Sequence, residues 1–183
     1  MTKPYLLGIL LLVILGISGY YFLARPRSPV KNVSIPKHGD GKYVLYIDQS
    51  TITKPKDTSI YKYETRFIIS GVSLTNNTND TLKYISMSCS WWDIYHISDS
   101  SLGFLTLGCD KNVPQGVEIP PHQTRDMTFV LDVGKTTDVS GKKFKVGMNM
   151  VKYKSPEQVW DDLLFNKLAD QHNLLWSNEV SIP

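Results

Sequence analysis

Large apolar side chains alternate with polar ones over most of residues 42–154. Residues 43–48 and 124–132 show the pattern most clearly, with an apolar side chain at every second position. Successive side chains of a strand point to opposite faces, so this period of two predicts strands with one buried face. Turn residues separate the strands, which predicts a mainly β domain over residues 42–183, folded as an antiparallel sandwich or barrel, of which we expect the sandwich. The other predicted strands are residues 63–75, 82–92, 102–108, 117–119, 144–153 and 178–182.

The longest segment, residues 63–75, changes its pattern midway. Phe67 and Ile69 share one face of an extended strand, whereas Val72 falls on the opposite face. A bulge inserts one extra residue and so reverses the side-chain parity, and glycine is typical of such positions. The sequence therefore predicts a bulge at Ser70-Gly71.

One later segment has helical spacing. Ser155 is followed by a proline, and Gln158 lies three residues after it, which is typical of a helix N-terminus. We therefore predict one amphipathic helix over residues 156–173, whose apolar stripe covers the sandwich. Its apolar positions, at nearly helical intervals, are Val159, Trp160, Leu163, Leu164 and Leu168, with Leu175 following.

Before the β region, residues 5–24 form an uninterrupted apolar run. The run contains no charged side chain, and its 20 residues would span about 30 Å as a helix, the thickness of a bilayer's hydrocarbon core. Pro26 and its two flanking arginines end the run, since proline cannot continue a helix. We therefore predict a short tail (residues 1–4), a transmembrane helix that acts as a signal anchor (residues 5–24), and an extended tether rich in proline and glycine (residues 25–41).

Three glycines, Gly8, Gly16 and Gly19, lie within this run. Small residues let two membrane helices approach closely, so these positions are candidates for packing against a helix of another protein. Glycine is also frequent in membrane spans that have no specific partner, and this alternative stays open.

Two alternatives concern how the chain is inserted in a membrane. Residues 16–18 weakly resemble a signal-peptidase site, but the apolar run continues past them to Leu23, which favours an uncleaved anchor. More basic residues follow the run than precede it, which by the positive-inside rule favours a cytoplasmic domain. The short basic tail before a long apolar core favours export instead. We expect an extracytoplasmic domain, in the periplasm on a bacterial inner membrane.

Two short motifs carry a resemblance to known sandwiches. Residues 119–124 read Ile-Pro-Pro-His-Gln-Thr, a proline turn that enters an alternating strand, and residues 176–180 read Trp-Ser-Asn-Glu-Val. With the strand pattern of residues 42–154, they resemble the immunoglobulin-like and fibronectin-type-III-like sandwiches of membrane-anchored envelope proteins. The antibody pattern of Cys, Trp and Cys is absent, because Cys89 and Trp91 are only two residues apart. The resemblance implies a fold and carries no function.

The chain contains two cysteines, Cys89 and Cys109. If residues 82–95 and 102–113 form a hairpin centred on Asp99, the two cysteines lie directly opposite each other on the core face. Opposite residues at a non-hydrogen-bonded site are within reach of a disulfide, so we predict a Cys89–Cys109 bond. Such a bond requires an oxidising compartment, which favours export. Two buried free thiols are the alternative.

Composition and motifs favour binding over catalysis. An apolar fraction of 42% excludes a wholly disordered chain, and a net charge of +3 with scattered basic residues argues against nucleic acid as a partner. The four histidines follow no metal-binding spacing, and no nucleophile elbow, phosphate loop or dinucleotide-binding motif is present. We therefore predict no enzyme activity, cofactor, metal or small-molecule substrate. An enzyme is the alternative, and it would need a polar cleft that holds His96, Asp99 or Asp110.

Trp92, Tyr95 and His96 are the candidate interface residues. If Trp91 points into the core, Trp92 points outward from the same strand, beside Tyr95 and His96. Exposed aromatic residues are frequent at the centre of protein interfaces, although another part of the domain would cover them equally well. The sequence thus predicts a non-catalytic domain that binds another protein, as an accessory subunit of a membrane complex. An immunity-type inhibitor that binds a toxin or hydrolase is the alternative.

Overall fold

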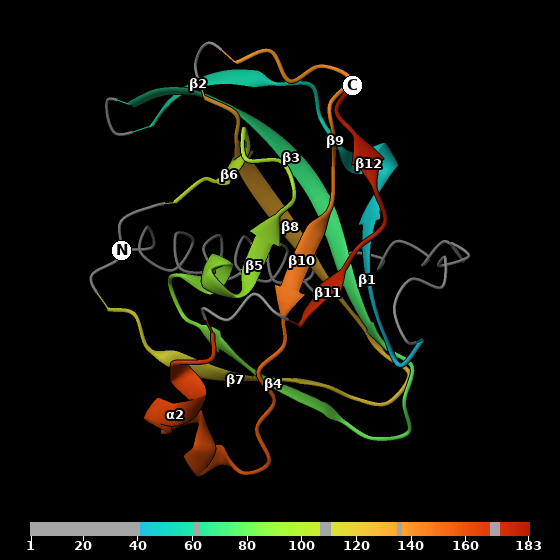
Figure 1. Ribbon diagram of the computed structural model, residues 1–183, viewed down its shortest axis with the longest axis vertical. Coiled ribbons are helices and arrows are strands. Elements are labelled where there is room, and N and C mark those ends of the chain that lie inside the picture. The colour runs from blue at the N-terminus through green and yellow to red at the C-terminus, as the bar shows by residue number, and fades with distance from the viewer. Residues whose placement is uncertain (1–40, 61–62, 107–110, 135–136, 169–172) are drawn as a thin grey trace, which may run out of the picture. The chain divides into compact units, whose positions relative to one another are not determined.

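The structure is a computed structural model, shown in Figure 1, and it describes residues 41–60, 63–106, 111–134, 137–168 and 173–183. All of them belong to the second of two units of the chain, Ile35–Pro183. The predicted tail, membrane helix and tether, with Gly8, Gly16 and Gly19, lie outside these ranges, as does Cys109. Within the described ranges, no helix has the length and apolar character needed to cross a membrane.

The largest sheet has five antiparallel strands in the order β1-β3-β8-β6, with β2 also paired to β3. Its centre is a continuous ladder between β3 and β8, which runs from Phe67 opposite Asp132 to Thr75 opposite Thr124. Among the described strands of this sheet, β2 alone lies outside the predicted ranges, because it is largely polar and shows no alternation. The strands are β1 (Tyr43–Asp48), β2 (Lys56–Ile60), β3 (Tyr63–Asn76), β6 (Gly103–Phe104) and β8 (Thr124–Asp132).

The bulge predicted at Gly71 is wrong, because β3 pairs with β8 without an inserted residue. Ile68, Val72 and Leu74 all face the core, so the buried side chains keep one parity along the strand. The apolar residues of opposite parity are half-buried on the other face. Gly71 instead leaves room for Thr51, whose Oγ1 accepts a hydrogen bond from the Gly71 N–H at 2.7 Å and would lie 2.9 Å from a β-carbon there.

Three smaller sheets complete the fold, in the orders β11-β10-β5, β4-β7 and β12-β9. In Figure 1, β5, β10 and β11 lie in front of β3 and β8. The rings of Tyr95 on β5 and Phe129 on β8 are in contact, with centres 4.8 Å apart. The described part of the chain is therefore mainly β and antiparallel, as predicted, and compatible with a sandwich. The strands are β4 (Leu82–Met87), β5 (Tyr95–Ile97), β7 (Pro114–Ile119), β9 (Lys143–Phe144), β10 (Val146–Asn149), β11 (Leu174–Trp176) and β12 (Val180–Ser181).

The hairpin predicted between residues 82–95 and 102–113 is wrong in its register. β4 pairs with β7, so Ile85 lies opposite Gly116 rather than opposite Val113. Within the predicted second strand, β6 joins β8, and the strand that pairs with β4 is β7, which begins only at Pro114. The predicted register required a single hairpin turn centred on Asp99, and β4 and β7 are not paired about that residue.

β4 ends in a turn, because a side chain, and not a neighbouring strand, accepts the hydrogen bonds from backbone N–H groups shortly after it. Asn112 Oδ1 accepts hydrogen bonds from the N–H groups of Cys89 at 3.2 Å and Ser90 at 3.1 Å. The Ser90 hydroxyl donates to the Asp93 carboxylate. Such local bonds compete with a strand ladder, and the 3₁₀ helix η2 (Trp91–Ile94) begins directly after them.

The single helix predicted over residues 156–173 is wrong. The segment contains a 3₁₀ helix, η3 (Pro156–Trp160), and a single α-helical turn, α2 (Asp162–Phe165). Asp161 separates them with extended backbone, and its side chain accepts a hydrogen bond from the Leu163 N–H at 2.9 Å. Aspartate favours this capping position over a helix interior, so it ends one turn and starts the next.

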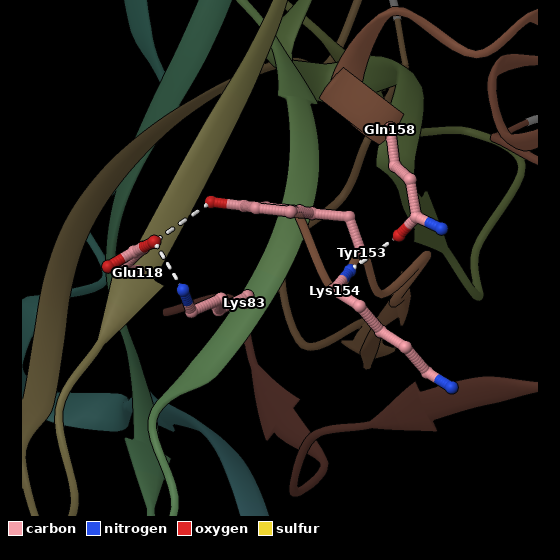
Figure 2. A network of polar contacts seen from close by, with 5 residues as sticks. All are labelled: Lys83, Glu118, Tyr153, Lys154 and Gln158. Carbon is pink, nitrogen blue, oxygen red and sulfur yellow. Dashed lines mark hydrogen bonds and ion pairs between the residues drawn. The ribbon is translucent and has the colours of Figure 1, made fainter. Parts of the chain in front are cut away.

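The start of η3 also differs from the predicted cap. Ser155 makes no side-chain capping bond. The Gln158 Oε1 instead accepts a hydrogen bond from the Lys154 N–H at 2.7 Å, as Figure 2 shows. Gln158 therefore does reach back to the helix start, one residue earlier than a capping box requires.

Residues 151–153 run beside β4 and anchor a polar network on β7. Tyr153 lies across Gly116, where a β-carbon would be only 2.5 Å from its hydroxyl oxygen. The hydroxyl donates to Glu118 Oε1 at 3.3 Å, and Lys83 Nζ lies 3.1 Å from the same oxygen (Figure 2). Burial and the Glu118 carboxylate raise the pKa of Tyr153, so its hydroxyl stays a donor.

Candidate functional site

Four aromatic side chains meet where η2, β5, β6 and β8 come together. The ring centre of Phe129 lies 5.0 Å from that of Trp91, 4.8 Å from that of Tyr95 and 5.5 Å from that of Phe104. Phe129 is buried and Trp91 is half-buried, so the cluster extends from the core to the surface. Most of the contacts are edge-to-face, an arrangement that adds to burial and fixes the orientation of the rings.

A cavity of about 200 Å³, which we call the aromatic pocket, opens beside this cluster. β8 contributes Arg125, Met127 and Phe129, which share one face because alternate residues of a strand point the same way. Tyr84 on β4 and Val117 on β7 form the opposite wall. The rings of η2 and β5 complete the lining, so the pocket lies between several strands of the fold and the half-buried part of the cluster.

Polar groups of the pocket gather around the hydroxyls of Tyr84 and Tyr95. The Tyr95 hydroxyl donates to Met127 Sδ at 3.2 Å, and the Tyr84 side chain lines the same pocket. Burial raises the pKa of both tyrosines, while the positive charge of Arg125 acts in the opposite direction. Both phenols are therefore neutral at physiological pH, and the charge of the pocket is that of Arg125.

Arg125 lies at the mouth of the pocket, near the start of β8, and its side chain is exposed. Among the described residues, no carboxylate lies within ion-pair distance of its guanidinium. Guanidinium groups bind carboxylates through paired hydrogen bonds of fixed geometry. The arrangement thus offers an anion a charged donor next to two phenol hydroxyls.

The three predicted interface residues do not share one face. Trp92 belongs to η2 rather than to a strand, is half-buried, and packs edge-on against Trp91 with ring centres 5.8 Å apart. Tyr95 is only 6% exposed and lines the aromatic pocket. His96 is the next residue of β5, so it points to the other face of that strand. In the structure Tyr95 lines the pocket, Trp92 packs against Trp91, and His96 lies on the other face of β5.

His96 occupies a row with Gly147 and Trp176 across β5, β10 and β11. A β-carbon at Gly147 would lie 3.0 Å from the Trp176 ring, so glycine leaves space for the indole above the sheet. The His96 Nε2 is buried and has no hydrogen-bond partner in the described part of the chain. Burial lowers the pKa of His96, which favours the neutral imidazole.

Asp99, considered above for a fold-assembled active site, is engaged by its own turn. Its carboxylate accepts hydrogen bonds from the Ser101 hydroxyl at 2.6 Å and the Ser101 N–H at 2.8 Å, and these bonds lower the pKa of Asp99. Asp110 lies outside the described residues. Over the ranges that the structure describes, no group of three His, Cys, Asp or Glu residues is arranged to hold a metal ion.

Cys89 lies just after β4, next to residues 111–113. Its Sγ is 3.0 Å from the Lys111 carbonyl oxygen, two residues along the chain from Cys109. Cys109 itself is not among the described residues, so the predicted disulfide stays a prediction.

Arg125 and Tyr84 are not among the site residues predicted from the sequence. One signal was available for Arg125, because it has the same parity as Met127 and Phe129, which were predicted to face inward. A charged residue at an inward position near a strand end is a candidate for a pocket mouth. Tyr84 offered no such signal, since it lies beside Ile85 and both are buried.

The sequence was compared with the models of known protein families and with curated proteins, and neither comparison found a match.

Proposed function

We propose that the described domain is a non-catalytic binding module, which holds a protein partner through the aromatic pocket. The observation that carries this proposal is the pocket itself, an open cavity with aromatic walls and an arginine at its mouth that has no acidic partner among the described residues. Apolar cavities with a few convergent polar groups are the usual form of a binding site. Aromatic residues and arginine also contribute most of the binding energy at protein interfaces.

The proposal includes a location outside the cytoplasm, with residues 5–24 as the membrane anchor. The uncharged length of that run supports a span. A Cys89–Cys109 disulfide would fit an oxidising compartment. Cys89 lies beside Lys111, two residues along the chain from Cys109, which is compatible with such a bond. Alkylation of the unfolded, non-reduced protein checks the bond. We expect no labelled thiol, and two labelled thiols would contradict the disulfide.

The finer fold and role belong to the same proposal. We infer an immunoglobulin-like sandwich from the contact of β5 on β8, and an accessory subunit of a membrane complex from the predicted anchor. An anchor raises the effective concentration of the module near a partner in the same membrane. Exchange of residues 5–24 for an unrelated span distinguishes an accessory subunit from an immunity-type inhibitor. It should abolish the function of a subunit that packs through Gly8, Gly16 and Gly19, and should spare an immunity-type inhibitor.

Photo-crosslinking from the pocket tests the binding function. Replacement of Trp91 by p-benzoylphenylalanine puts a reactive ketone beside the pocket and keeps an aromatic ring there. We expect a discrete protein adduct from this position in illuminated cells, because a partner group in the pocket would lie next to the ketone. A melting curve of the purified variant verifies that the fold is retained.

Trp160 provides the matched control, because it is 65% exposed and does not line the pocket. The same replacement there should give no discrete adduct. A folded Trp91 variant without an adduct would contradict the proposal. An adduct from position 160 alone would move the binding surface to η3 and α2.

A further inference from the structure

We propose that the aromatic pocket binds an apolar group that carries a carboxylate, with the hydrocarbon part against the aromatic walls and the carboxylate on Arg125. The inference rests on the proposed function, because it states the chemistry of the group that fills the pocket. A free carboxylic acid and the last residue of a polypeptide both offer this chemistry.

The walls and size of the pocket favour one compact apolar group. Trp91, Phe129 and Val117 all face the cavity. Its volume of about 200 Å³ is below the range of roughly 300–1,000 Å³ that is typical of pockets for drug-sized ligands. The pocket therefore accommodates one aromatic ring or branched aliphatic group, rather than a cofactor or an extended chain.

The polar end of the pocket offers donors. The Arg125 guanidinium has N–H groups and no acceptor. The hydroxyls of Tyr84 and Tyr95 each carry a proton. The proton of Tyr95 is donated to Met127 Sδ at 3.2 Å, and a thioether is a weak acceptor. An oxygen acceptor that enters the pocket satisfies this proton.

The sign of the charge selects an anion. Aromatic rings alone also bind ammonium groups, but Arg125 is close enough to change the pKa of both tyrosines, and its charge repels a cation. A carboxylate accepts paired hydrogen bonds from a guanidinium and displaces no ion pair formed by the described residues. A neutral apolar group would leave Arg125 and the tyrosine proton without this acceptor.

The test uses the full chain in a non-ionic detergent, with its methionine methyl groups labelled with carbon-13. The Met127 methyl resonance, assigned with a Met127→Leu variant, reports on the pocket. The probes are 3-phenylpropionate and 3-phenylpropionamide, which share one hydrocarbon and differ in charge. We expect the acid to shift the Met127 resonance at about tenfold lower concentration than the amide, since a charged partner for Arg125 contributes about that factor. Arg125→Gln should remove this preference and leave the affinity for the amide unchanged.

Lys143→Gln is the control for a general effect of charge, because the Lys143 side chain is 68% exposed and does not line the pocket. It should keep the preference for the acid. Equal binding of acid and amide, or a preference that survives Arg125→Gln, overturns the inference. The proposed function then still stands or falls by the crosslink from position 91. The absence of any Met127 shift with either probe at millimolar concentration overturns the inference as well.

A second pair of probes distinguishes the two sources of the carboxylate. The tripeptide acetyl-Gly-Gly-Phe is added with a free or an amidated end. Tighter binding of the free-ended peptide than of 3-phenylpropionate assigns the pocket to a chain end, and tighter binding of 3-phenylpropionate assigns it to a free acid. Both results support a carboxylate on Arg125, whereas equal binding of the two peptides and of the two small probes contradicts it.

Discussion

The β3–β8 ladder buries its large apolar side chains, whereas the segment of η3 and α2 leaves two of them exposed to solvent. Leu74 on β3 and Leu131 on β8 are fully buried, whereas Trp160 is 65% and Leu163 is 73% exposed. The ladder holds its side chains in fixed rows, because each strand continues the backbone hydrogen bonds of its neighbour. The two helical turns comprise five and four residues, too few to present a continuous apolar stripe to the core. Burial therefore depends on the partner that a segment finds, and not on the side chains alone.

Phe129→Ala should give the largest effect, because this ring joins the ladder to the aromatic cluster. Phe129 is 1% exposed and contacts three other rings. Truncation of such a buried ring costs about 3–5 kcal/mol of unfolding free energy, through lost burial and the cavity left behind. Urea denaturation of the purified chain measures the loss. Thr128→Ala, at an exposed position of the same strand, should stay within about 0.5 kcal/mol, and equal effects of the two would refute the contrast.

Asn76→Ala tests whether a buried side chain fixes the end of the ladder. The Asn76 Nδ2 donates to the carbonyl oxygens of Asp80, Ile119 and Pro120, and Asn76 is fully buried. Its loss leaves buried acceptors without a donor, so we expect about 1–3 kcal/mol of destabilisation. Asn76→Asp keeps the shape but not the donor, and should destabilise as well. A stable Asn76→Asp variant would mean that water or the backbone replaces these bonds.

The sequence predicted the sheet well where a strand is long and has one buried face. β1 and β8 match the predicted ranges, and β3 differs by one residue. The errors arose where a side chain replaces a backbone partner, since such bonds leave no periodic signal. Asn112 ends the strand after Met87, and Asp161 divides the predicted helix. Gly71 showed a further limit, because a glycine needed for close approach looks the same in sequence as one in a bulge.

The site was less predictable than the sheet, because its residues come from strands far apart in the chain. The sequence predicted Tyr95 for an outer surface, whereas in the structure its side chain lines the aromatic pocket. Alternation along a strand also placed Trp92 on a β face, whereas η2 turns it against Trp91. Arg125 on β8 and Tyr84 on β4 come together only at the aromatic pocket that both line, which depends on tertiary structure and not on sequence spacing.

Alkaline pH should lower the free energy of unfolding, because ionisation of the buried Tyr84 and Tyr95 is disfavoured in the folded state. Burial raises the pKa of Tyr84 and Tyr95 above that of an unfolded tyrosine, about 10. Their contribution to stability is complete below pH 10 and is lost as the pH rises toward the folded-state value, by up to about 1.4 kcal/mol per pH unit for each group. Urea denaturation at about pH 8 and about pH 11 measures the loss. Tyr95→Phe should show a smaller difference between the two pH values, and an unchanged difference would mean that Tyr95 ionises freely in the fold.

Leu163→Ala should have the smallest effect, and it tests the other side of the comparison. Leu163 and Leu168 belong to the same predicted apolar stripe, and one continuous helix would have made them similar in environment. In the structure Leu163 is 73% exposed and Leu168 is 5% exposed, since Leu163 lies within α2 and Leu168 follows the end of α2 at Phe165. Leu163→Ala should therefore change the unfolding free energy by less than about 0.5 kcal/mol, as surface substitutions usually do. The same substitution at Leu168 should cost several times more, through lost burial. If both cost the same large amount, one helix buries both leucines and the end of α2 at Phe165 is wrong.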